Sequence, residues 1–447
     1  MKKIAVIGSG ISGNSAAWAL GKSFDVTLFE MDERTGGHSN TVKIDYNGKE
    51  LAVDTGFIVY NDHNYPLLTK LFNYLDVTTS PSNMSFGVSL DNGTFEWSGQ
   101  GLRNVFAQRR NLFSPKFLFM LKEIFAFNRI CKEDLKSGAL CGSSFEEYLV
   151  TRKFSQRLKD DYLVPMTAAI WSTPPKRMLE FPAESLVRFL DNHRLIHKAS
   201  ERPNWRTVTG GSRQYVEKLY ADFSGRIMTG KKVQMVLKAH DCVRLVFADG
   251  TVSLFDEVVI ATHSDQALAM IESPSAAQKT ILGSIGYKPN VVYLHRDPKL
   301  MPRRKDAWSA WNYLGARNSD GQRDLSVTYW MNRLQNIDDR YPLFVSLNPE
   351  KAPGADKIFH VFQYDHPQFD KAAMAAQLRL HEIQGQDRLW FCGAWTKYGF
   401  HEDGLASGLA VARSLGAQIP FEARALPDKA PVPDNDQPEP VPLQAAE

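Results

Sequence analysis

The chain has 447 residues, too many for one ordinary hydrophobic core, so we expect two or three domains. Its formal net charge of +3 is small for this length and argues against nucleic acid as a partner, because nucleic-acid-binding proteins usually carry a strong basic stripe. The spacing of the four cysteines suits neither a disulfide framework nor a zinc site, so no metal is expected. The N-terminus lacks the pattern of a signal peptide, and no stretch reaches the roughly 18 apolar residues of a membrane span, so a cytoplasmic location is expected.

The N-terminal segment predicts a β-strand, a glycine turn, a helix and a second β-strand. Lys3–Ile7 and Asp25–Phe29 are apolar runs typical of buried parallel strands, and Ile11–Leu20 has helical spacing. Between the first strand and the helix, residues 8–13 read Gly-Ser-Gly-Ile-Ser-Gly. This order is that of a βαβ unit.

Within this unit the glycine turn has the GxGxxG spacing of a dinucleotide site. Gly8 permits the tight turn, Gly10 lets the main chain approach a pyrophosphate, and Gly13 lets the helix pack closely on the strand. We expect the amides at the helix N-terminus and the hydroxyl of Ser12 to bind phosphate. Glu30 ends the second strand, where an acid accepts hydrogen bonds from a ribose diol. A plain glycine turn is the weaker alternative, because the whole unit is present.

Two later blocks show the same strand-rich pattern. The first is predicted to contain three strands, at Lys232–Leu237, Val243–Phe247 and Glu257–Ala261. Asp249-Gly250 predicts a hairpin turn between the second and third of these strands. The second block is predicted to contain a strand, a loop and a helix, at Arg388–Cys392, 393–404 and Leu405–Leu415. We expect both blocks to join the N-terminal segment in one domain.

Further motifs distinguish between dinucleotides. In chain order they are Arg34-Thr35-Gly36-Gly37-His38, Val53-Asp54-Thr55-Gly56, Thr209-Gly210-Gly211, Ile260-Ala261-Thr262, Phe391-Cys392-Gly393-Ala394 and Gly404-Leu405-Ala406-Ser407-Gly408. Together, and in this order, they resemble the signature of the superfamily of flavin amine oxidases, protoporphyrinogen oxidases and phytoene desaturases. The resemblance implies FAD as the cofactor.

The expected fold is α/β and amine-oxidase-like: a Rossmann-type FAD-binding domain, discontinuous in sequence, with an inserted α+β substrate domain. The FAD-binding domain is expected to comprise residues 1–65, 205–286 and 385–420. Residues 66–204 and 287–384 are rich in aromatic side chains and are expected to form the substrate-binding domain. Residues 421–447 are Pro-rich and polar, which predicts a disordered tail.

The resemblance also implies which residues hold FAD. A first group surrounds the glycine turn and comprises Gly8, Gly10, Ile11, Ser12, Gly13, Glu30, Arg34, Gly36, Gly37 and His38. A second group approaches the flavin ring or the adenine and comprises Gly56, Phe57, Ile58 and Val233. A third belongs to the C-terminal motif, where helix amides face the flavin pyrimidine, and comprises Gly393, Gly404, Leu405 and Ala406.

Three positions depart from the wider family. His38 stands where arginine is frequent, so the pyrophosphate would receive less positive charge. Ala394 stands where an acid is usual. His401 stands where amine oxidases place an aromatic residue that forms half of a cage for the amine. Because a histidine makes a poor cage wall, this position argues against amine oxidation.

Three residues are candidates for chemistry beside the flavin. His401 and Glu402 lie just before the C-terminal glycine motif, where either could act as a base or form a hydrogen bond with the ring. The alternative is that Glu402 and Asp403 complement the N-terminus of the following helix. His295 lies near the place where amine oxidases hold a water with a lysine, although a hydrogen-bonded histidine at a strand end is favoured there.

A narrower resemblance points toward lipids. The segments 165–174, 202–205, 307–313 and 399–404 resemble a bacterial group of predicted NAD/FAD-binding proteins, and a similar domain is fused to cyclopropane fatty acid synthases in plants. The resemblance implies a lipid or fatty acyl substrate, including a methylated or cyclopropane-related chain, and a fatty-acid methyltransferase as a partner.

These observations predict an FAD-dependent oxidoreductase that dehydrogenates, and so desaturates, an acyl chain by hydride transfer to flavin N5. Two alternatives stay open: a flavin amine oxidase that uses oxygen, and a non-catalytic flavin-binding partner of a lipid methyltransferase.

The segment Leu112–Ile130 is apolar and aromatic and lies among basic residues, namely Arg109, Arg110, Lys116, Lys122 and Arg129. Such a mixture suits a helix in peripheral contact with the inner face of the membrane. A core helix of the substrate domain with solvated charges is the favoured interpretation.

Overall fold

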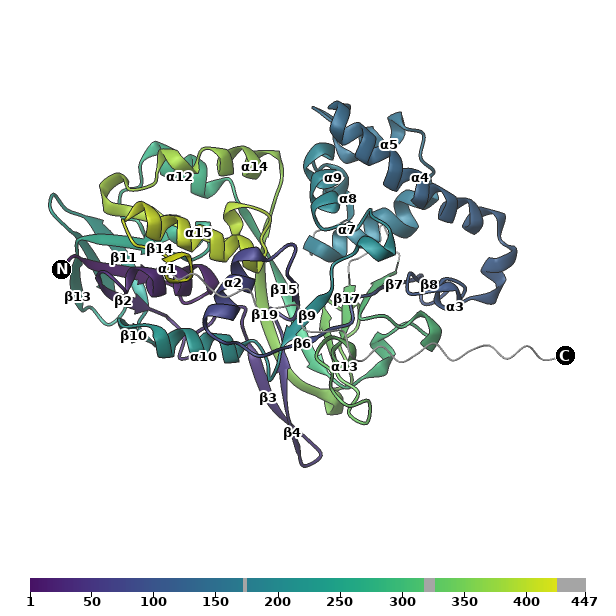
Figure 1. Cartoon of the computed structure of the whole chain (residues 1–447), viewed down its shortest axis with the longest axis horizontal. Helices are drawn as coiled ribbons and strands as arrows, with labels where there is room; N and C mark the ends of the chain where they lie inside the picture. Colours follow the sequence, from purple (N-terminus) through teal and green to yellow (C-terminus); the bar gives the residue numbers. More distant parts are fainter. Residues whose placement is uncertain (172–174, 317–325, 424–447) are drawn as a thin grey trace.

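The computed structural model describes residues 1–171, 175–316 and 326–423. One half of the molecule, on the left in Figure 1, is built on a five-stranded sheet in which every neighbouring pair is parallel. In spatial order its strands are β10 (Arg226–Met228), β2 (Asp25–Phe29), β1 (Lys3–Ile7), β14 (Glu257–Ile260) and β20 (Leu389–Phe391). Segments far apart in the sequence therefore share one sheet, as expected for a discontinuous domain.

Alternate side chains of this sheet enter two separate cores. Ile4 and Val6 pack with the helices of one face, which are α1 (Ile11–Leu20), α2 (Pro66–Tyr74), α10 (Arg213–Asp222) and α15 (His401–Ser414). Ala5 and Ile7 face the other layer, which contains β11 (Val233–Lys238), β12 (Val243–Phe247), β13 (Val252–Phe255), α11 (Ser264–Met270), α12 (Ala276–Gly283) and α14 (Lys371–Leu378). Burial on both faces explains why these strands are continuous apolar runs rather than alternating ones.

The other half contains a seven-stranded mixed sheet. In spatial order its strands are β19 (Ile358–Gln368), β15 (Gly286–His295), β18 (Phe344–Leu347), β17 (Ser326–Trp330), β16 (Trp311–Gly315), β7 (Phe86–Leu90) and β8 (Phe95–Ser98). The antiparallel strands β15 and β19 are the longest and run through the middle of the molecule (Figure 1). They bring the substrate sheet up to the dinucleotide half.

A helical layer covers this sheet (Figure 1, upper right). Its helices are α4 (Pro115–Ser137), α5 (Phe145–Thr151), α6 (Gln156–Leu158), α7 (Val164–Trp171), α8 (Pro175–Leu179) and α9 (Ala183–Asn192). Helix α4 starts at a Ser114 cap and buries Phe117, Met120, Glu123, Phe127 and Cys131, which recur every three to four residues. The favoured interpretation of this segment as a helix packed on the substrate-domain core is therefore correct for one face of α4.

Short elements complete the two halves. Two are small sheets, β3 (Thr41–Tyr46) paired with β4 (Lys49–Asp54), and β5 (Tyr60–Asn61), β9 (Trp205–Val208) and β6 (Thr79–Pro81). The short helices lie apart from one another: α3 (Leu102–Val105) contacts β8, α13 (Met331–Leu334) contacts β17 and β18, and α16 (Pro420–Ala423) contacts α2.

The structure corrects several expected boundaries. The hairpin turn at Asp249-Gly250 leads into β13, a strand that the sequence analysis missed, and β14 lies in the parallel sheet instead. Helices α2 and α14, which were placed in the substrate domain, pack on the parallel sheet. The tail was expected from residue 421, but Phe421 is buried and stacks on Trp18. The rest of that expected tail, 424–447, lies outside the described residues.

In the described part of the chain, no helix combines the length and the apolar character needed to cross a bilayer.

Candidate active site

The turn between β1 and α1 has the geometry that a dinucleotide needs. Gly8 has a φ of +99°, which side chains rarely adopt, and its amide donates to the Phe29 carbonyl at 2.8 Å. A Cβ at Gly13 would lie 1.8 Å from the Gly8 carbonyl oxygen, so only glycine lets α1 come this close. A Cβ at Gly10 would meet no atom within 4 Å. The missing side chain of Gly10 therefore leaves the N-terminus of α1 open to a ligand.

Glu30 closes the far side of this turn. Its Oε2 accepts hydrogen bonds from the Ser9 amide at 2.9 Å and the Ser9 hydroxyl at 2.5 Å, and its Oε1 accepts one from the Asp32 amide at 3.1 Å. The carboxylate thus fixes the turn at the edge of a cavity, at the place where acids in such units bind a ribose.

One cavity of 2410 Å³ extends from this turn into the substrate half. Because ordinary ligand pockets measure about 300–1,000 Å³, this cavity has room for a dinucleotide and a second ligand. Of the residues expected to hold FAD, the cavity is lined by Gly8, Gly10, Ile11, Ser12, Glu30, Arg34, Gly37, His38, Gly56, Phe57, Ile58, Val233 and Gly393. The segments that the motifs singled out thus meet around one space, although most of them are far apart in sequence.

Five of the expected residues do not line the cavity: Gly13, Gly36, Gly404, Leu405 and Ala406. Gly404 acts in packing instead, since a Cβ there would lie 2.7 Å from Cγ2 of Ile11 on α1. Leu405 is fully buried in the core between α1 and α15. Gly404 and Leu405 thus let α1 and α15 pack closely, which brings the N-termini of both helices to the cavity.

His38 and Arg34 both line the cavity close to the glycine turn. Burial, the largest cause, lowers the pKa of His38 to about 3, so its ring is neutral. Its Nε2 is buried without a hydrogen bond. Arg34 donates to the carbonyls of Thr35 at 3.2 Å and Gly37 at 3.0 Å, and it also lines the cavity. Arg34 therefore places a positive charge in the cavity wall near the neutral ring of His38.

His401 lies in the first turn of α15, which begins four residues before the expected start at Leu405. Its ring stacks on Phe57 with centroids 3.9 Å apart, and its Nε2 lies 2.7 Å from the Tyr215 hydroxyl. Burial lowers its pKa to about 3. His401 is therefore a neutral, hydrogen-bonded ring in the cavity wall, where it lines the same space as the FAD motifs.

Glu402 and Asp403 have structural partners. The two Glu402 oxygens accept hydrogen bonds from the amides of Leu67 at 2.8 Å and Leu68 at 3.0 Å, in the first turn of α2. Burial raises the pKa of Glu402 to about 7, and Glu402 does not line the cavity. Asp403 accepts a hydrogen bond from the Phe400 amide at 3.1 Å and so caps its own helix. The geometry places Glu402 at a helix contact, away from the position expected of a catalytic group.

His295 is likewise placed away from the cavity. It is fully buried at the end of β15, where Nε2 lies 2.8 Å from the Ser346 hydroxyl and Nδ1 accepts a hydrogen bond from the Asp297 amide at 3.0 Å. Burial lowers its pKa to about 4. The geometry is that of the hydrogen-bonded histidine at a strand end that the sequence favoured, and it corrects the other expectation, that His295 acts beside the flavin.

Strand β19 forms a part of the cavity wall that the sequence did not predict. His360, Phe362, Tyr364 and His366 alternate along this strand and all line the cavity. The Tyr364 ring lies 4.8 Å from that of His38 between centroids. The aromatic residue at every second position from 360 to 366 was the signal that could have predicted a strand with one aromatic face.

Two further ionisable groups of the cavity wall had no assigned role. His263, after β14, stacks on Tyr287 with centroids 4.4 Å apart, and burial lowers its pKa. Asp365 lines the cavity, and its buried Oδ1 has no hydrogen-bond donor. Together with His366, whose pKa burial lowers to about 4, they surround the middle of the cavity with ionisable side chains.

The far end of the cavity lies between the helical layer and the seven-stranded sheet. Side chains that line it include Met166, Ile170, Phe189, Trp311, Tyr329 and Val345. Apolar and aromatic groups of both layers thus enclose a space that favours a hydrophobic ligand.

Comparison with known proteins agrees with this architecture. The model of the family described as flavin containing amine oxidoreductase matches residues 11–354. No curated protein matches the chain. Solved structures with the same fold include the CLA-producing fatty acid isomerase of P. acnes, at 14% identity with a TM-score of 0.65 over 92% of this chain and 98% of that one. They also include cyclohexylamine oxidase of Brevibacterium oxydans, at 14% identity with a TM-score of 0.63 over 93% and 99%.

FAD fits the residues that are present. The glycine turn opens the N-terminus of α1 to a pyrophosphate, Glu30 stands at the ribose position, and the buried His38 Nε2 has no protein partner. These residues, with Arg34 and the N-terminus of α15, would hold the cofactor. The chain belongs to the flavin-containing amine oxidoreductase family and is an FAD-dependent oxidoreductase.

Proposed function

We propose that the protein dehydrogenates a lipid or fatty acyl chain, removing hydrogens from two neighbouring carbons to form a double bond. The observation that carries this proposal is the apolar far end of the cavity, lined by Met166, Ile170 and Phe189 from the helices and Val345 from the sheet. Such a wall binds a hydrocarbon chain through burial of apolar surface. A structural neighbour that is a fatty acid isomerase supports the same substrate class.

The cavity wall near the cofactor also favours carbon–carbon oxidation. An amine cage needs an aromatic side chain at position 401, where this chain has a histidine. The His401 ring is held in place by stacking on Phe57 and by a hydrogen bond with the Tyr215 hydroxyl. FAD, when bound, supplies the electron acceptor. The proton that leaves the substrate needs an acceptor, and the cavity wall offers four imidazoles as candidates: His38, His263, His366 and His401.

The test is anaerobic reduction of the purified flavoprotein, followed through the visible absorbance of its flavin. Fatty acids and phospholipids that carry saturated, monounsaturated and methyl-branched chains should bleach the flavin, and the lipid product should gain one double bond. The variant Ile170→Asp places a charge in the apolar wall and should slow bleaching at least about a hundredfold, whereas Ile170→Leu should react as the wild type does. Bleaching by simple amines but by no acyl lipid would contradict the proposal.

Amine oxidation is the second candidate, and one observation favours it. Asp365 lines the cavity with an unpaired, buried Oδ1, which could accept a hydrogen bond from a substrate ammonium. In that case Asp365→Asn should abolish bleaching by amines, and His401→Tyr should preserve or improve it. If neither lipids nor amines reduce the flavin, a non-catalytic partner of a lipid methyltransferase is the remaining candidate, and co-purification with such an enzyme would support it.

A further inference from the structure

Exposed apolar side chains gather at one end of the helical layer. They belong to α3, the 3-10 helix Arg109–Phe113 and the first part of α4, and we call them the α3–α4 patch: Leu102, Leu112, Phe113, Leu118, Phe119 and Phe125. Phe113, Phe119 and Phe125 are 86%, 55% and 75% exposed, and no other phenylalanine among the described residues is exposed. Such a cluster marks an interaction surface, because soluble surfaces rarely expose neighbouring large rings.

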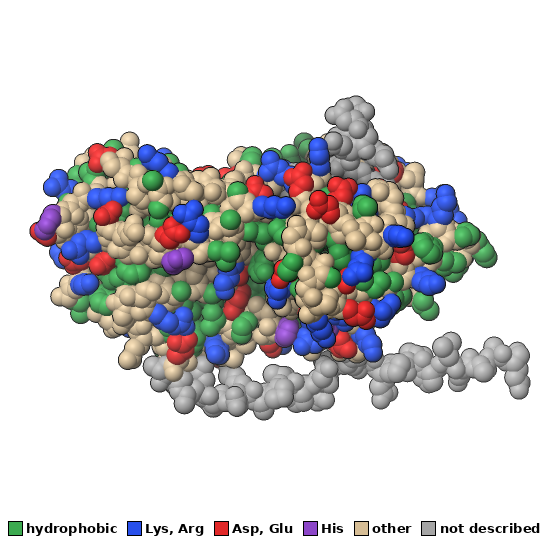
Figure 2. Space-filling model, turned by 90° about the horizontal axis from the view of Figure 1, so that it is seen from above, with side chains coloured by type: hydrophobic (Ala, Val, Ile, Leu, Met, Phe, Trp, Pro, Cys, Tyr) green, Lys and Arg blue, Asp and Glu red, His purple; other side chains and the backbone are tan. Residues whose placement is uncertain are grey.

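The same segment is strongly basic. Residues 102–122 contain five cations and no acid. Arg109, Lys116 and Lys122 form no ion pair with any residue that the structure describes, while Arg103 pairs with Asp306. Figure 2 shows hydrophobic and basic side chains side by side at this end of the molecule, on the right. Exposed rings among unpaired cations complement an anionic bilayer, in which rings enter the interface and cations meet the headgroups.

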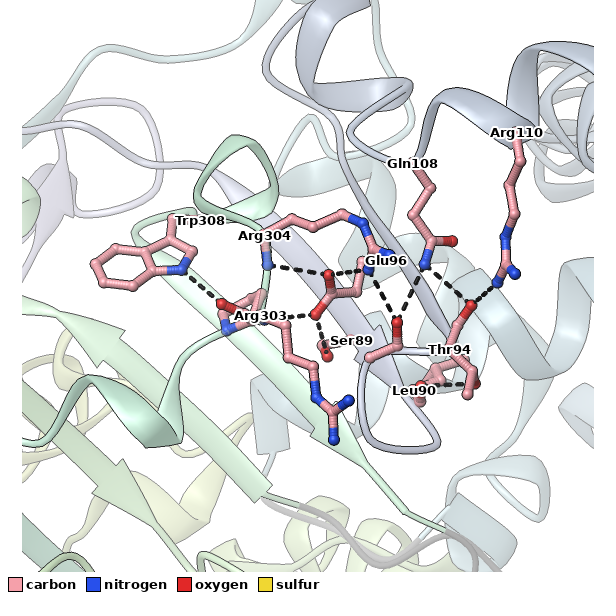
Figure 3. A network of polar contacts seen from close by, with 11 residues as sticks. Ser89, Leu90, Thr94, Glu96, Gln108, Arg110, Arg303, Arg304 and Trp308 are labelled. Carbon is pink, nitrogen blue, oxygen red and sulfur yellow. Dashed lines mark hydrogen bonds and ion pairs between the residues drawn. The ribbon is translucent and has the colours of Figure 1, made fainter.

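A network of polar contacts, from buried to exposed, holds this patch in place (Figure 3). The Gln108 side chain donates to the carbonyls of Gly93 at 3.1 Å and Thr94 at 3.0 Å, and Arg110 also donates to Thr94. The turn that carries these carbonyls is tied through Glu96, which is fully buried and accepts a hydrogen bond from the Arg304 guanidinium at 2.8 Å. The patch therefore presents a fixed surface rather than a loose loop.

The cavity reaches the surface beside this patch. Helix α4 contributes Leu121, Ile124 and Phe125 to the cavity wall, so Phe125 belongs to both the patch and the wall. Three of the residues that line this end are exposed cations, Arg129, Lys198 and Arg202. An acyl chain that entered here would leave its anionic headgroup among these cations.

We propose that the α3–α4 patch docks the protein on an anionic lipid bilayer, with Phe113 and Phe119 in the interface, and so places the cavity mouth at the membrane surface. The docking follows from the patch itself. That the docked protein takes its acyl substrate directly from the bilayer rests on the function proposed above. No membrane-spanning segment is needed, because rings and cations together give reversible peripheral binding.

The test is sedimentation of the flavin-loaded full-length protein with vesicles of phosphatidylglycerol and phosphatidylethanolamine, or of phosphatidylcholine alone. Wild-type protein should sediment with the anionic vesicles, more weakly with neutral ones, and less as salt is raised. Lys116→Glu/Lys122→Glu should weaken binding to anionic vesicles at least about twentyfold, since each cation near such a surface contributes about fivefold. Phe113→Ser/Phe119→Ser should weaken binding to a similar degree.

Matched controls lie on other surfaces. Val252→Ser/Leu378→Ser removes exposed apolar side chains, and Lys49→Glu/Lys279→Glu reverses exposed charges, so both should bind as the wild type does. The docking proposal would be overturned if the wild-type protein did not sediment with anionic vesicles. It would also be overturned if the control variants lost as much binding as the patch variants.

A second readout separates docking from chemistry. Phe113→Ser/Phe119→Ser should keep the wild-type rate of flavin reduction with a detergent-solubilised acyl lipid and lose it with the same lipid in vesicles. If no lipid reduces the flavin in either form while the vesicles still bind the wild type, the function proposal fails and the docking proposal stands. Equal rates on vesicles for variant and wild type would show that substrate does not enter through the docked face.

Discussion

The two halves of the molecule build their binding surfaces in different ways. The dinucleotide half relies on main-chain geometry: the open N-terminus of α1, the close contact at Gly13 and the turn fixed by Glu30. The substrate half relies on side chains of two packed layers, which enclose the apolar end of the cavity. Main-chain geometry permits few residue types at each position, whereas a packed wall of side chains accepts many. The dinucleotide half is therefore restricted to one type of cofactor, while substitutions in the substrate half can change which substrate binds.

The largest effect is expected where main chain meets main chain. Gly13→Val would force a side chain against the Gly8 carbonyl oxygen, which a Cβ would approach to 1.8 Å, and neither segment can yield. We expect loss of bound FAD and a decrease of about 3 kcal/mol or more in the free energy of unfolding. Flavin absorbance of the purified protein and urea denaturation measure both.

Gly283→Ala is the matched control, since a Cβ at this α12 position meets Leu268 at an ordinary 3.5 Å. Its flavin content and stability should stay near those of the wild type. If the Gly13→Val protein retained FAD, the turn could relax around a side chain. The statement that main-chain geometry restricts the dinucleotide half would then be wrong.

This difference between main-chain and side-chain surfaces also explains which parts of the site were predictable from the sequence. The glycine turn, Glu30 and the parallel strands were predictable, because each depends on a few neighbouring residues with special geometry. The substrate wall was not, because its residues come from separate layers and each is an ordinary apolar side chain by itself. His366 and Asp365 reach the cavity only through the pairing of β19 with β15.

Glu402 and His295 were candidates for chemistry, but the fold places both away from the cavity, again through contacts between distant segments. Glu402 follows His401 in sequence, but neighbouring positions on a helix point in different directions, and only His401 lines the cavity. The partners of Glu402 are amides of α2, more than 300 residues away, and no local pattern reports them. The expectation for His295 rested on the family resemblance alone, and its burial against Ser346 depends on the pairing of β15 with β18.

A second variant tests the substrate half alone. Glu96→Ala would leave the amides of Arg303 and Arg304 and the guanidinium of Arg304 without their buried acceptor. We expect a decrease of about 3 kcal/mol in the free energy of unfolding, measured with urea, while the folded protein keeps its FAD. Glu133→Ala removes an exposed carboxylate on α4 and should cost less than about 0.5 kcal/mol. Loss of FAD from folded Glu96→Ala protein would mean that the halves are not separable.

A third variant tests the contact between α15 and α2 through pH. Burial raises the folded pKa of Glu402 from 4.5 to about 7, so between these values the folded protein binds a proton that the unfolded chain has released. The contribution of Glu402 to the free energy of unfolding is therefore fully present below pH 4.5 and is lost as pH rises through 7. Glu402→Gln should lack this component, so the stability difference between variant and wild type should change by about 2 kcal/mol between pH 5 and pH 8. A pH-independent difference would show that Glu402 keeps an ordinary pKa.

The smallest effect is expected at His295, and it gives the sharpest comparison of a buried histidine with one that lines the cavity. His295→Gln keeps a donor for Ser346 but loses the acceptor for the Asp297 amide, so it should cost about 1 kcal/mol of stability and leave the flavin spectrum unchanged. The same substitution at His366 removes a ring from the cavity wall and should alter the flavin spectrum or its rate of reduction. The two variants change the same chemistry in strands β15 and β19, which are paired along their length. If His295→Gln slowed flavin reduction without loss of stability, this histidine would act in the reaction despite its position, and the separation of structural from cavity histidines would be wrong.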